Sequence, residues 1–229
     1  MNNLITMQEW NAMNGKEQTI WLEDNCQVNA RGRSRRLVRG VGVNDAPYCT
    51  KHRTDGKQVN CPAYTAWNAM LRRAYSDKYH AEHQTYSGVT VCDEWHTFMS
   101  FRKWWLENQV DGWQIDKDIL SDAACYSPDT CLFVPAWLNT FTIDSDAIRG
   151  ELPIGVDFHK QAGKYRARCR HSLAGRRGRL GLGLFDTPEE AHLAWLNRKL
   201  ELALELKPKM DEIDLRIYPR VVEIINNAK

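Results

Sequence analysis

In the N-terminal two thirds of the chain, hydrophobic positions follow a helical spacing in two places. The clearer one begins at Pro62, and its apolar positions recur at intervals of three and four residues: Trp67, Met70, Leu71 and Ala74. A second helix is predicted from Asp93 to Trp105, with its acidic residues in the first turn. The polar segment 76–88 predicts a loop between them, and a short helix is expected over residues 7–13.

The middle of the chain has the pattern of a hairpin followed by a short helix. Two strand-like segments are separated by a polar loop, and these are Trp113–Leu120 and Thr130–Val134. Pro135 then suits the first turn of a helix over Ala136–Thr142. The polar segment around Gly150 predicts a domain boundary.

The C-terminal segment predicts a small three-stranded sheet followed by one long helix. Three strand-like segments are separated by glycine-containing turns, at residues 154–159, 164–171 and 179–185. A strong helix start follows, in which Thr187 can cap, Pro188 suits the first position and Glu190 completes a capping box. This helix is expected to reach Leu206, and a final helix, interrupted or kinked at Pro219, is expected after it.

These elements predict an α+β protein in three parts. Residues 1–60 form a basic N-terminal arm, residues 61–149 a hairpin-and-helix region with flanking helices, and residues 150–229 a three-stranded antiparallel sheet packed on one helix. No apolar run approaches the roughly 20 residues that cross a bilayer, and the N-terminus lacks the pattern of a secretory signal. A cytoplasmic protein without membrane contact is expected, and its seven cysteines are expected to be free thiols.

Charge changes this picture through its distribution, because the net charge is only +2. The segment from Asn25 to Asn44 holds five arginines and no acid, and the segment from Phe158 to Phe185 holds eight Lys or Arg and no acid. Basic stretches of this kind in a near-neutral protein are typical of a surface that binds a polyanion. A pair of solvated loops is the alternative interpretation.

The strand predicted over residues 164–171 places its cations on one face. Lys164, Arg166, Arg168 and Arg170 alternate with residues that are mostly small or apolar, so the cations point away from the helix that follows. A basic ribbon fits the major groove of DNA, where some arginines would contact guanine and others phosphate. A charged solvent face explains one or two such cations well but four in phase poorly, and Arg176, Arg177 and Arg179 extend the set.

The segments LPIGVDFHKQAGKYRARC and GRLGLGLFDTPEEAHLAWLNRKL resemble the plant Apetala-type, or ethylene-response-factor, DNA-binding domain. That family reads the major groove with a three-stranded sheet packed on one helix, and Gly181 stands where it often has tryptophan. The resemblance implies double-stranded DNA as the partner. It implies base and backbone contacts from the first two strands, by His159, Lys160, Lys164, Arg166, Arg168 and Arg170.

The segment GWQIDKDILSDAACYSPDTCLFVPAWLNTF resembles the HNH, or ββα-metal, nuclease motif, in a form common in phage genomes. In that family an Asp-His pair on the first strand binds a divalent metal and activates water, an Asn orients the loop, and a helical His or Asn completes the metal site. The resemblance implies that Asp116 and Asn139 bind Mg²⁺ or another divalent metal and that Thr130 takes the loop position. Lys117 replaces the general-base histidine, and Asp118 could act as a substitute base or second ligand.

The replacement at Lys117 leaves two functions open. One is a sequence-recognising, homing-type DNA endonuclease that cuts phosphodiester bonds with one metal, in the host cytoplasm if it is phage-encoded. The other is a catalytically silent DNA-binding regulator on a degenerate HNH scaffold, because an exposed lysine is protonated at neutral pH and acts as a base only when burial lowers its pKa strongly. An RNA-binding structural protein is a third candidate.

Two other interpretations of single motifs also stay open. The segment Asp116-Lys117-Asp118 can be a solvated strand without chemistry. Four further side chains could be zinc ligands: Cys49, His52, Cys61 and Cys92. Buried thiols without a metal are the alternative interpretation of these cysteines.

Overall fold

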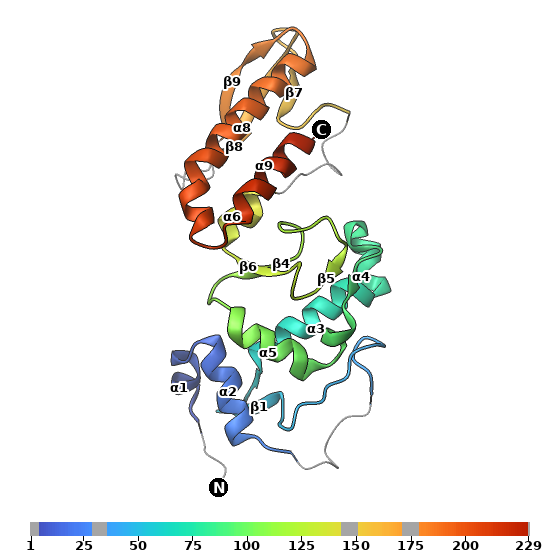
Figure 1. The fold of residues 1–229 in the computed structure, drawn as a ribbon, viewed down its shortest axis with the longest axis vertical. Helices are drawn as coiled ribbons and strands as arrows, with labels where there is room; N and C mark the ends of the chain where they lie inside the picture. The colour runs from blue at the N-terminus through green and yellow to red at the C-terminus, as the bar shows by residue number, and fades with distance from the viewer. Residues whose placement is uncertain (1–4, 29–35, 143–150, 171–178, 229) are drawn as a thin grey trace. The chain divides into compact units, whose positions relative to one another are not determined.

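The computed structural model describes residues 5–28, 36–142, 151–170 and 179–228, except for the side chain of Arg179 (Figure 1). The chain divides into two compact units: Met1–Asp118 with Asp122–Phe133, and Ile119–Ser121 with Val134–Lys229. The boundary predicted near Gly150 falls outside the described residues, and the observed division comes earlier in the chain. The short helix after Pro135 therefore belongs to the second unit.

The first unit is built from short helices and three small two-stranded sheets. Its described elements are α1 (Met7–Ala12), α2 (Gly15–Asn25), β1 (Lys51–Thr54), β2 (Lys57–Asn60), α3 (Pro62–Tyr75), α4 (Asp77–Glu82), η2 (Gln84–Tyr86), β3 (Thr90–Val91), η3 (Asp93–His96), α5 (Phe98–Asn108), β4 (Gln114–Asp116), β5 (Cys125–Tyr126) and β6 (Leu132–Val134). Strands β1 and β2 pair antiparallel, β3 and β5 pair parallel, and β4 pairs with β6.

An aromatic core between α3 and α5 holds the first unit together. The helix predicted from Pro62 is confirmed as α3, and it buries the four apolar positions expected of it. Trp67 lies 5.5 Å from Phe98, measured between ring centres, and its Nε1 donates a hydrogen bond to the carbonyl of Trp95 at 2.7 Å. All three rings are fully buried, so they serve as core.

The expected helix from Asp93 is divided into η3 and α5 by a contact from a distant part of the chain. The backbone amide of Val43 donates to the carbonyl of His96 at 2.8 Å, and the amide of Phe98 donates to the carbonyl of Val43 at 3.0 Å. These bonds replace helical ones at the junction, so the helix begins again at Phe98.

The loop expected over residues 76–88 was also only partly right, because α4 begins there with Ser76 as its cap.

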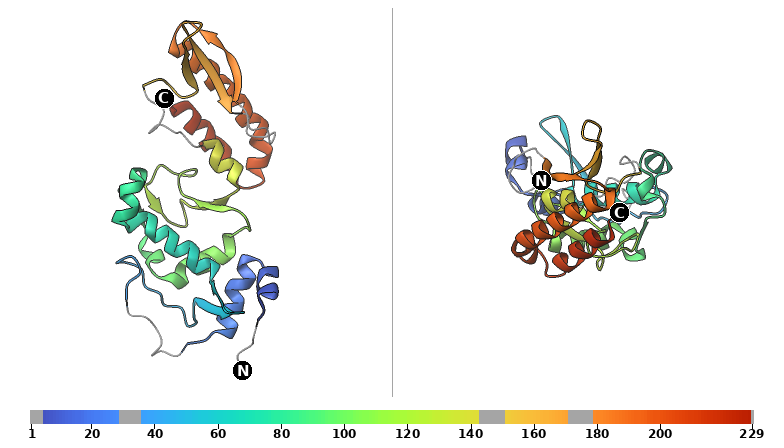
Figure 2. Two further views of the ribbon diagram at one scale, coloured as in Figure 1. Left: turned by 180° about the vertical axis from the view of Figure 1, so that it is seen from behind. Right: turned by 90° about the horizontal axis from the view of Figure 1, so that it is seen from above.

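The second unit contains the predicted three-stranded antiparallel sheet and helix. Its described elements are α6 (Ala136–Thr142), β7 (Val156–His159), β8 (Lys164–Arg170), β9 (Arg179–Phe185), α8 (Pro188–Asp211) and α9 (Ile217–Asn227). The strand order is β7–β8–β9, and α8 lies along one face of the sheet (Figures 1 and 2). The predicted capping box of Thr187 and Glu190 is confirmed.

Both C-terminal helices differ from expectation at their prolines. Helix α8 continues past Leu206 to Asp211, with Pro208 inside it. Helix α9 is not interrupted by Pro219, because this residue lies in the first turn, where its missing N–H would have no helical partner. None of the helices in the described ranges is long and apolar enough to cross a membrane.

The position of α6 decides how far the hairpin-and-helix expectation holds. The two strands of the hairpin do pair, as β4 and β6, and α6 begins after Pro135 as predicted. The helix, however, contacts α9 in the second unit, while β4 belongs to the first. The mixed α+β class is therefore confirmed, and the ββα unit itself is not.

Candidate nucleic-acid interface

Strand β8 separates its cations from its apolar residues as its alternating sequence predicts. Ala167 and Cys169 are buried, at 0% and 1% exposure, against the side of the sheet that α8 covers. Tyr165 packs on the same small core, which contains Val156 and Ala191. The residues between them therefore point to the opposite face of the sheet, which we call the outer face.

Strand register places further residues on the outer face. His159 lies opposite Lys164, and Asp157 lies opposite Arg166. On the other side of β8, Leu184 lies opposite Arg166, and Gly181 lies opposite Arg168. The outer face therefore consists of Asp157, His159, Lys164, Arg166, Arg168, Arg170, Gly181 and Leu184.

The remaining predicted DNA contacts have different positions. Lys160 is exposed just after β7. Arg179 lies opposite Arg170 in the strand register, but its side chain is not described. Arg176 and Arg177 lie outside the described residues.

Two carboxylates compensate part of the positive charge on the outer face. Arg166 Nη2 donates a hydrogen bond to Asp157 Oδ2 at 2.7 Å, and Arg168 Nε lies 2.7 Å from Asp157 Oδ1. Lys164 Nζ lies 3.1 Å from Asp186 Oδ1. Both acids stand directly outside the acid-free segment, so counting charges within that segment missed them.

The shared carboxylate of Asp157 is held in its charged form. Partial burial alone would raise the pKa of Asp157, but the hydrogen bond from Arg166 and the charges of Arg168 and Arg166 outweigh it and lower the pKa. Arg170, by contrast, is exposed and forms no ion pair with any residue that the structure describes. Ion pairs with Asp157 therefore hold Arg166 and Arg168 at the centre of the outer face, whereas Arg170 near the end of β8 pairs with no carboxylate among the described residues.

A half-buried lysine behind the sheet was not predicted from the sequence. Lys199 of α8 places its Nζ 3.7 Å from the ring centre of Phe141 in α6. Burial lowers the pKa of Lys199 to about 8, although the neighbouring thiol of Cys169 opposes this shift. A lysine on the long helix reads as a solvent-exposed residue in the sequence, and only the packing of α6 shows that it is covered.

In the first unit, the predicted catalytic residues form a network of structural contacts. Asp116 Oδ1 accepts a hydrogen bond from the backbone amide of Asp118 at 2.9 Å. Lys117 is buried, with its Nζ paired with the Asp118 carboxylate and 5.8 Å from the ring centre of Tyr126. The amine of Lys117 is thus engaged with a neighbouring carboxylate and an aromatic ring.

Thr130 stabilises the hairpin loop through its hydroxyl group. The Thr130 Oγ1 donates to the carbonyl of Cys125 at 2.7 Å and accepts from the backbone amide of Ser127 at 3.0 Å. These bonds close the turn between β5 and β6.

The residues proposed as metal ligands are not brought together within one unit. Asp116 belongs to the first unit, and Asn139 of α6 belongs to the second. In the described parts of the chain, no group of three or more His, Cys, Asp or Glu side chains is arranged to hold a metal ion. A divalent metal bound by Asp116 and Asn139 therefore stays a prediction from the sequence.

The cysteines of the alternative zinc set do not form such a group either. All seven cysteines are free thiols. Cys61 is buried, with its Sγ 3.7 Å from both Tyr48 Oη and Thr19 Oγ1, so hydroxyl groups surround it.

The chain matches no known protein-family model, no curated protein and no solved structure. Its function is therefore inferred from the geometry of the two units. The outer face of the second unit gathers the four cations of β8 on one side of a sheet.

Proposed function

We propose that the protein binds double-stranded DNA through the outer face of the sheet β7–β8–β9. The observation that carries this proposal is that β8 projects four cations from one face while α8 covers the other. The seven residues of β8 extend over about 20 Å at the usual strand rise. A basic β-ribbon of this length fits the major groove, which admits two-stranded ribbons.

The ion pairs on the outer face favour contact with base edges at its centre. Arg166 and Arg168 offer N–H donors, and Asp157 beside them offers an acceptor, which together match the alternating acceptors and donors of base pairs in the major groove. Shared contact with one carboxylate also holds both guanidinium groups in place before DNA arrives, which limits the entropy lost on binding.

The ends of β8 are better suited to phosphate. Arg170 carries a charge that no described carboxylate compensates, and Lys164 shares its charge with the largely exposed Asp186. Phosphate contacts fix the register of a protein on the duplex without reading its sequence. The outer face therefore combines a central pair for base contacts with flanking cations for the backbone.

The salt dependence of binding tests this proposal. The affinity of the full chain for a pool of random duplexes is measured by fluorescence anisotropy at several salt concentrations. If the protein makes about five to seven phosphate contacts, log K falls with log salt with a slope of about −4.5 to −6. A slope near zero contradicts DNA binding by a cationic face.

Metal-dependent DNA cleavage is a second candidate function, and one observation favours it. The Thr130 hydroxyl closes the turn between β5 and β6, and the HNH resemblance gives Thr130 the loop-orienting position. Against it stands the buried side chain of Lys117, whose amine is paired with the Asp118 carboxylate. DNA binding without cleavage, as in a regulator, is therefore the function that the geometry supports best.

A further inference from the structure

A tight turn in the basic N-terminal arm presents an arginine in an unusual backbone conformation. The backbone groups of Val38 and Gly42 exchange two hydrogen bonds, at 2.7 and 2.8 Å, around a turn formed by Arg39 and Gly40. Both turn residues are left-handed, with φ values of 53° for Arg39 and 82° for Gly40. We call residues 36–42 the arginine turn.

The residue type at position 39 does not match its conformation. Left-handed φ values are favourable for glycine and tolerated by Asn and Asp, whose side chains bond locally, but they are unfavourable for a long side chain. In the described ranges, Asp55 is the other non-glycine residue with a positive φ, and it belongs to the tolerated class. An arginine kept against local preference points to a use of its side chain.

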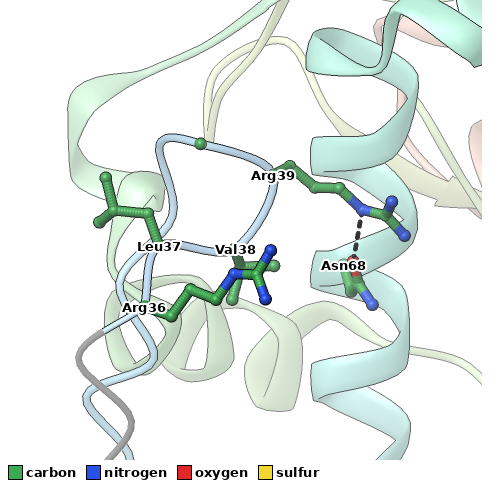
Figure 3. A pocket seen from close by; sticks show the side chains of 6 residues that line it. Arg36, Leu37, Val38, Arg39 and Asn68 are labelled. Carbon is green, nitrogen blue, oxygen red and sulfur yellow. Dashed lines mark hydrogen bonds between the residues drawn. The ribbon is translucent and has the colours of Figure 1, made fainter.

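Close packing on α3 fixes the arginine turn in position. A side chain at Gly42 would come within 2.5 Å of Leu71 and 2.8 Å of Trp67, so the backbone lies directly on the helix. Arg39 Nε donates a hydrogen bond to Asn68 Oδ1 at 3.1 Å (Figure 3). No carboxylate among the described residues forms an ion pair with Arg39, so a neutral amide orients the guanidinium and leaves its charge uncompensated.

The arginine turn and α3 line a shallow pocket of about 500 Å³ that is open to solvent. Arg36 and Arg39 extend from the turn toward Asn68 on α3, as Figure 3 shows. Leu37, Val38 and Gly40 complete the lining. The Arg39 guanidinium and the Asn68 amide at this shallow, open pocket offer N–H donors that match phosphate oxygens, which arginine binds with two parallel N–H groups.

We propose that this pocket binds a phosphate group of a DNA backbone, so that the first unit has a DNA contact of its own. The proposal does not depend on the outer face of the second unit. Two linked contacts raise the overall affinity far above that of either alone when both can engage one duplex. A free phosphate ion shares the same chemistry, so the experiment separates the two sources.

The substitution Arg39→Gly separates binding from folding. Glycine suits the left-handed conformation, so the thermal unfolding temperature of the full chain is expected to stay the same or rise. The affinity for random duplex DNA is expected to fall about tenfold, and the salt slope to lose about 0.9, the value for one phosphate contact. Lys57→Ala is the matched control, because it removes one exposed cation of the same unit outside the pocket.

The proposal is overturned if Arg39→Gly and Lys57→Ala change affinity and slope equally. It is also overturned if inorganic phosphate at millimolar concentration shifts the NMR signals of Arg39 while Arg39→Gly leaves DNA affinity unchanged, because the pocket is then a site for the free ion. Repeating Arg39→Gly in a chain that also carries Arg166→Ala and Arg168→Ala shows whether the loss persists when the outer face is disabled. A persistent loss supports the pocket even if the outer face does not bind DNA.

Discussion

At the scale of single residues, Asp157 decides how β8 presents its arginines. It holds two guanidinium groups on one carboxylate, which places donors and an acceptor side by side. The alternation of cations along β8 was predictable, because it depends on neighbours two positions apart. The ion pairs were not, because Asp157 reaches both arginines from the neighbouring strand and the register brings them together.

Asp157→Asn is expected to raise the affinity for random DNA and to reduce the preference for a selected target sequence. The substitution removes a negative charge that repels phosphate, and it replaces one of the two acceptor oxygens available for base readout with an NH2 donor. Anisotropy titrations with both kinds of duplex measure the two effects. A variant with lower affinity for random DNA would contradict this role.

The same residue predicts a pH dependence of stability. The folded pKa of Asp157 lies below its unfolded value of about 3.9, so its contribution is complete above that pH and is lost as pH falls through the folded pKa. Asp157→Asn is expected to lower the free energy of unfolding by up to about 1 kcal/mol at pH 7, since the pair is partly exposed. Urea unfolding at pH 7 and pH 3 tests this, and an equal difference at both values would contradict it.

Lys199 predicts a pH dependence in the alkaline range. Its pKa is about 8 in the folded protein and 10.5 without burial, so between these values the unfolded chain binds more protons and stability rises with pH. Lys199→Met is expected to remove this rise. Comparing the two proteins isolates the effect of Lys199, because the buried thiol of Cys169 is present in both. If both proteins show the same curve from pH 8 to 10.5, Lys199 is not buried as described.

At the scale of elements, predictions succeeded where the deciding residues are close in sequence. The start of α8 follows from its capping box, and α3 and α6 follow from a proline and a helical period. Predictions failed where a distant residue decides, as when Val43 divides the helix at His96. The same reason explains why the ββα unit is not confirmed. Nothing near Asn139 in the sequence shows that α6 contacts α9 and belongs to the second unit.

Gly155 controls how closely the sheet approaches α8. Its φ is +82°, and a side chain there would lie 2.1 Å from the ring of Trp195. Gly155→Ala is therefore expected to lower the free energy of unfolding by more than about 1 kcal/mol. Gly163→Ala is the matched control, because Gly163 also has a positive φ but has open space around it. Equal losses in thermal unfolding for the two variants would show that turn strain, and not close packing, decides.

At the scale of the whole molecule, our two proposals give each unit a cationic feature of its own for contact with DNA. The second unit has a flat strand face, and the first has a pocket at a tight turn. Linking modest contacts in one chain raises affinity without a large interface. DNA binding by two such features does not need a catalytic centre. It is therefore compatible with the buried position of Lys117, whose amine is paired with Asp118.

Cleavage of supercoiled plasmid with Mg²⁺ or Mn²⁺ tests whether the hairpin also carries chemistry. The geometry predicts no nicking by the wild-type chain, because Lys117 is buried and paired with Asp118. Nicking that Asp116→Ala abolishes would restore the nuclease interpretation. Nicking that Lys117→His introduces or accelerates would show that position 117 is the base position, since histidine titrates near about 6.5.

The central claim is that the outer face of the second unit contacts DNA, and a comparison of charge-matched variants tests it most directly. The full chain with Arg166→Ala and Arg168→Ala is compared with Lys51→Ala and Lys57→Ala, which removes two exposed cations from the first unit. On a duplex selected by the wild-type protein, we predict that the outer-face variant loses at least about 1–3 kcal/mol of binding free energy per base contact, whereas the control changes little. Equal affinities of the two variants for the selected duplex would contradict the account.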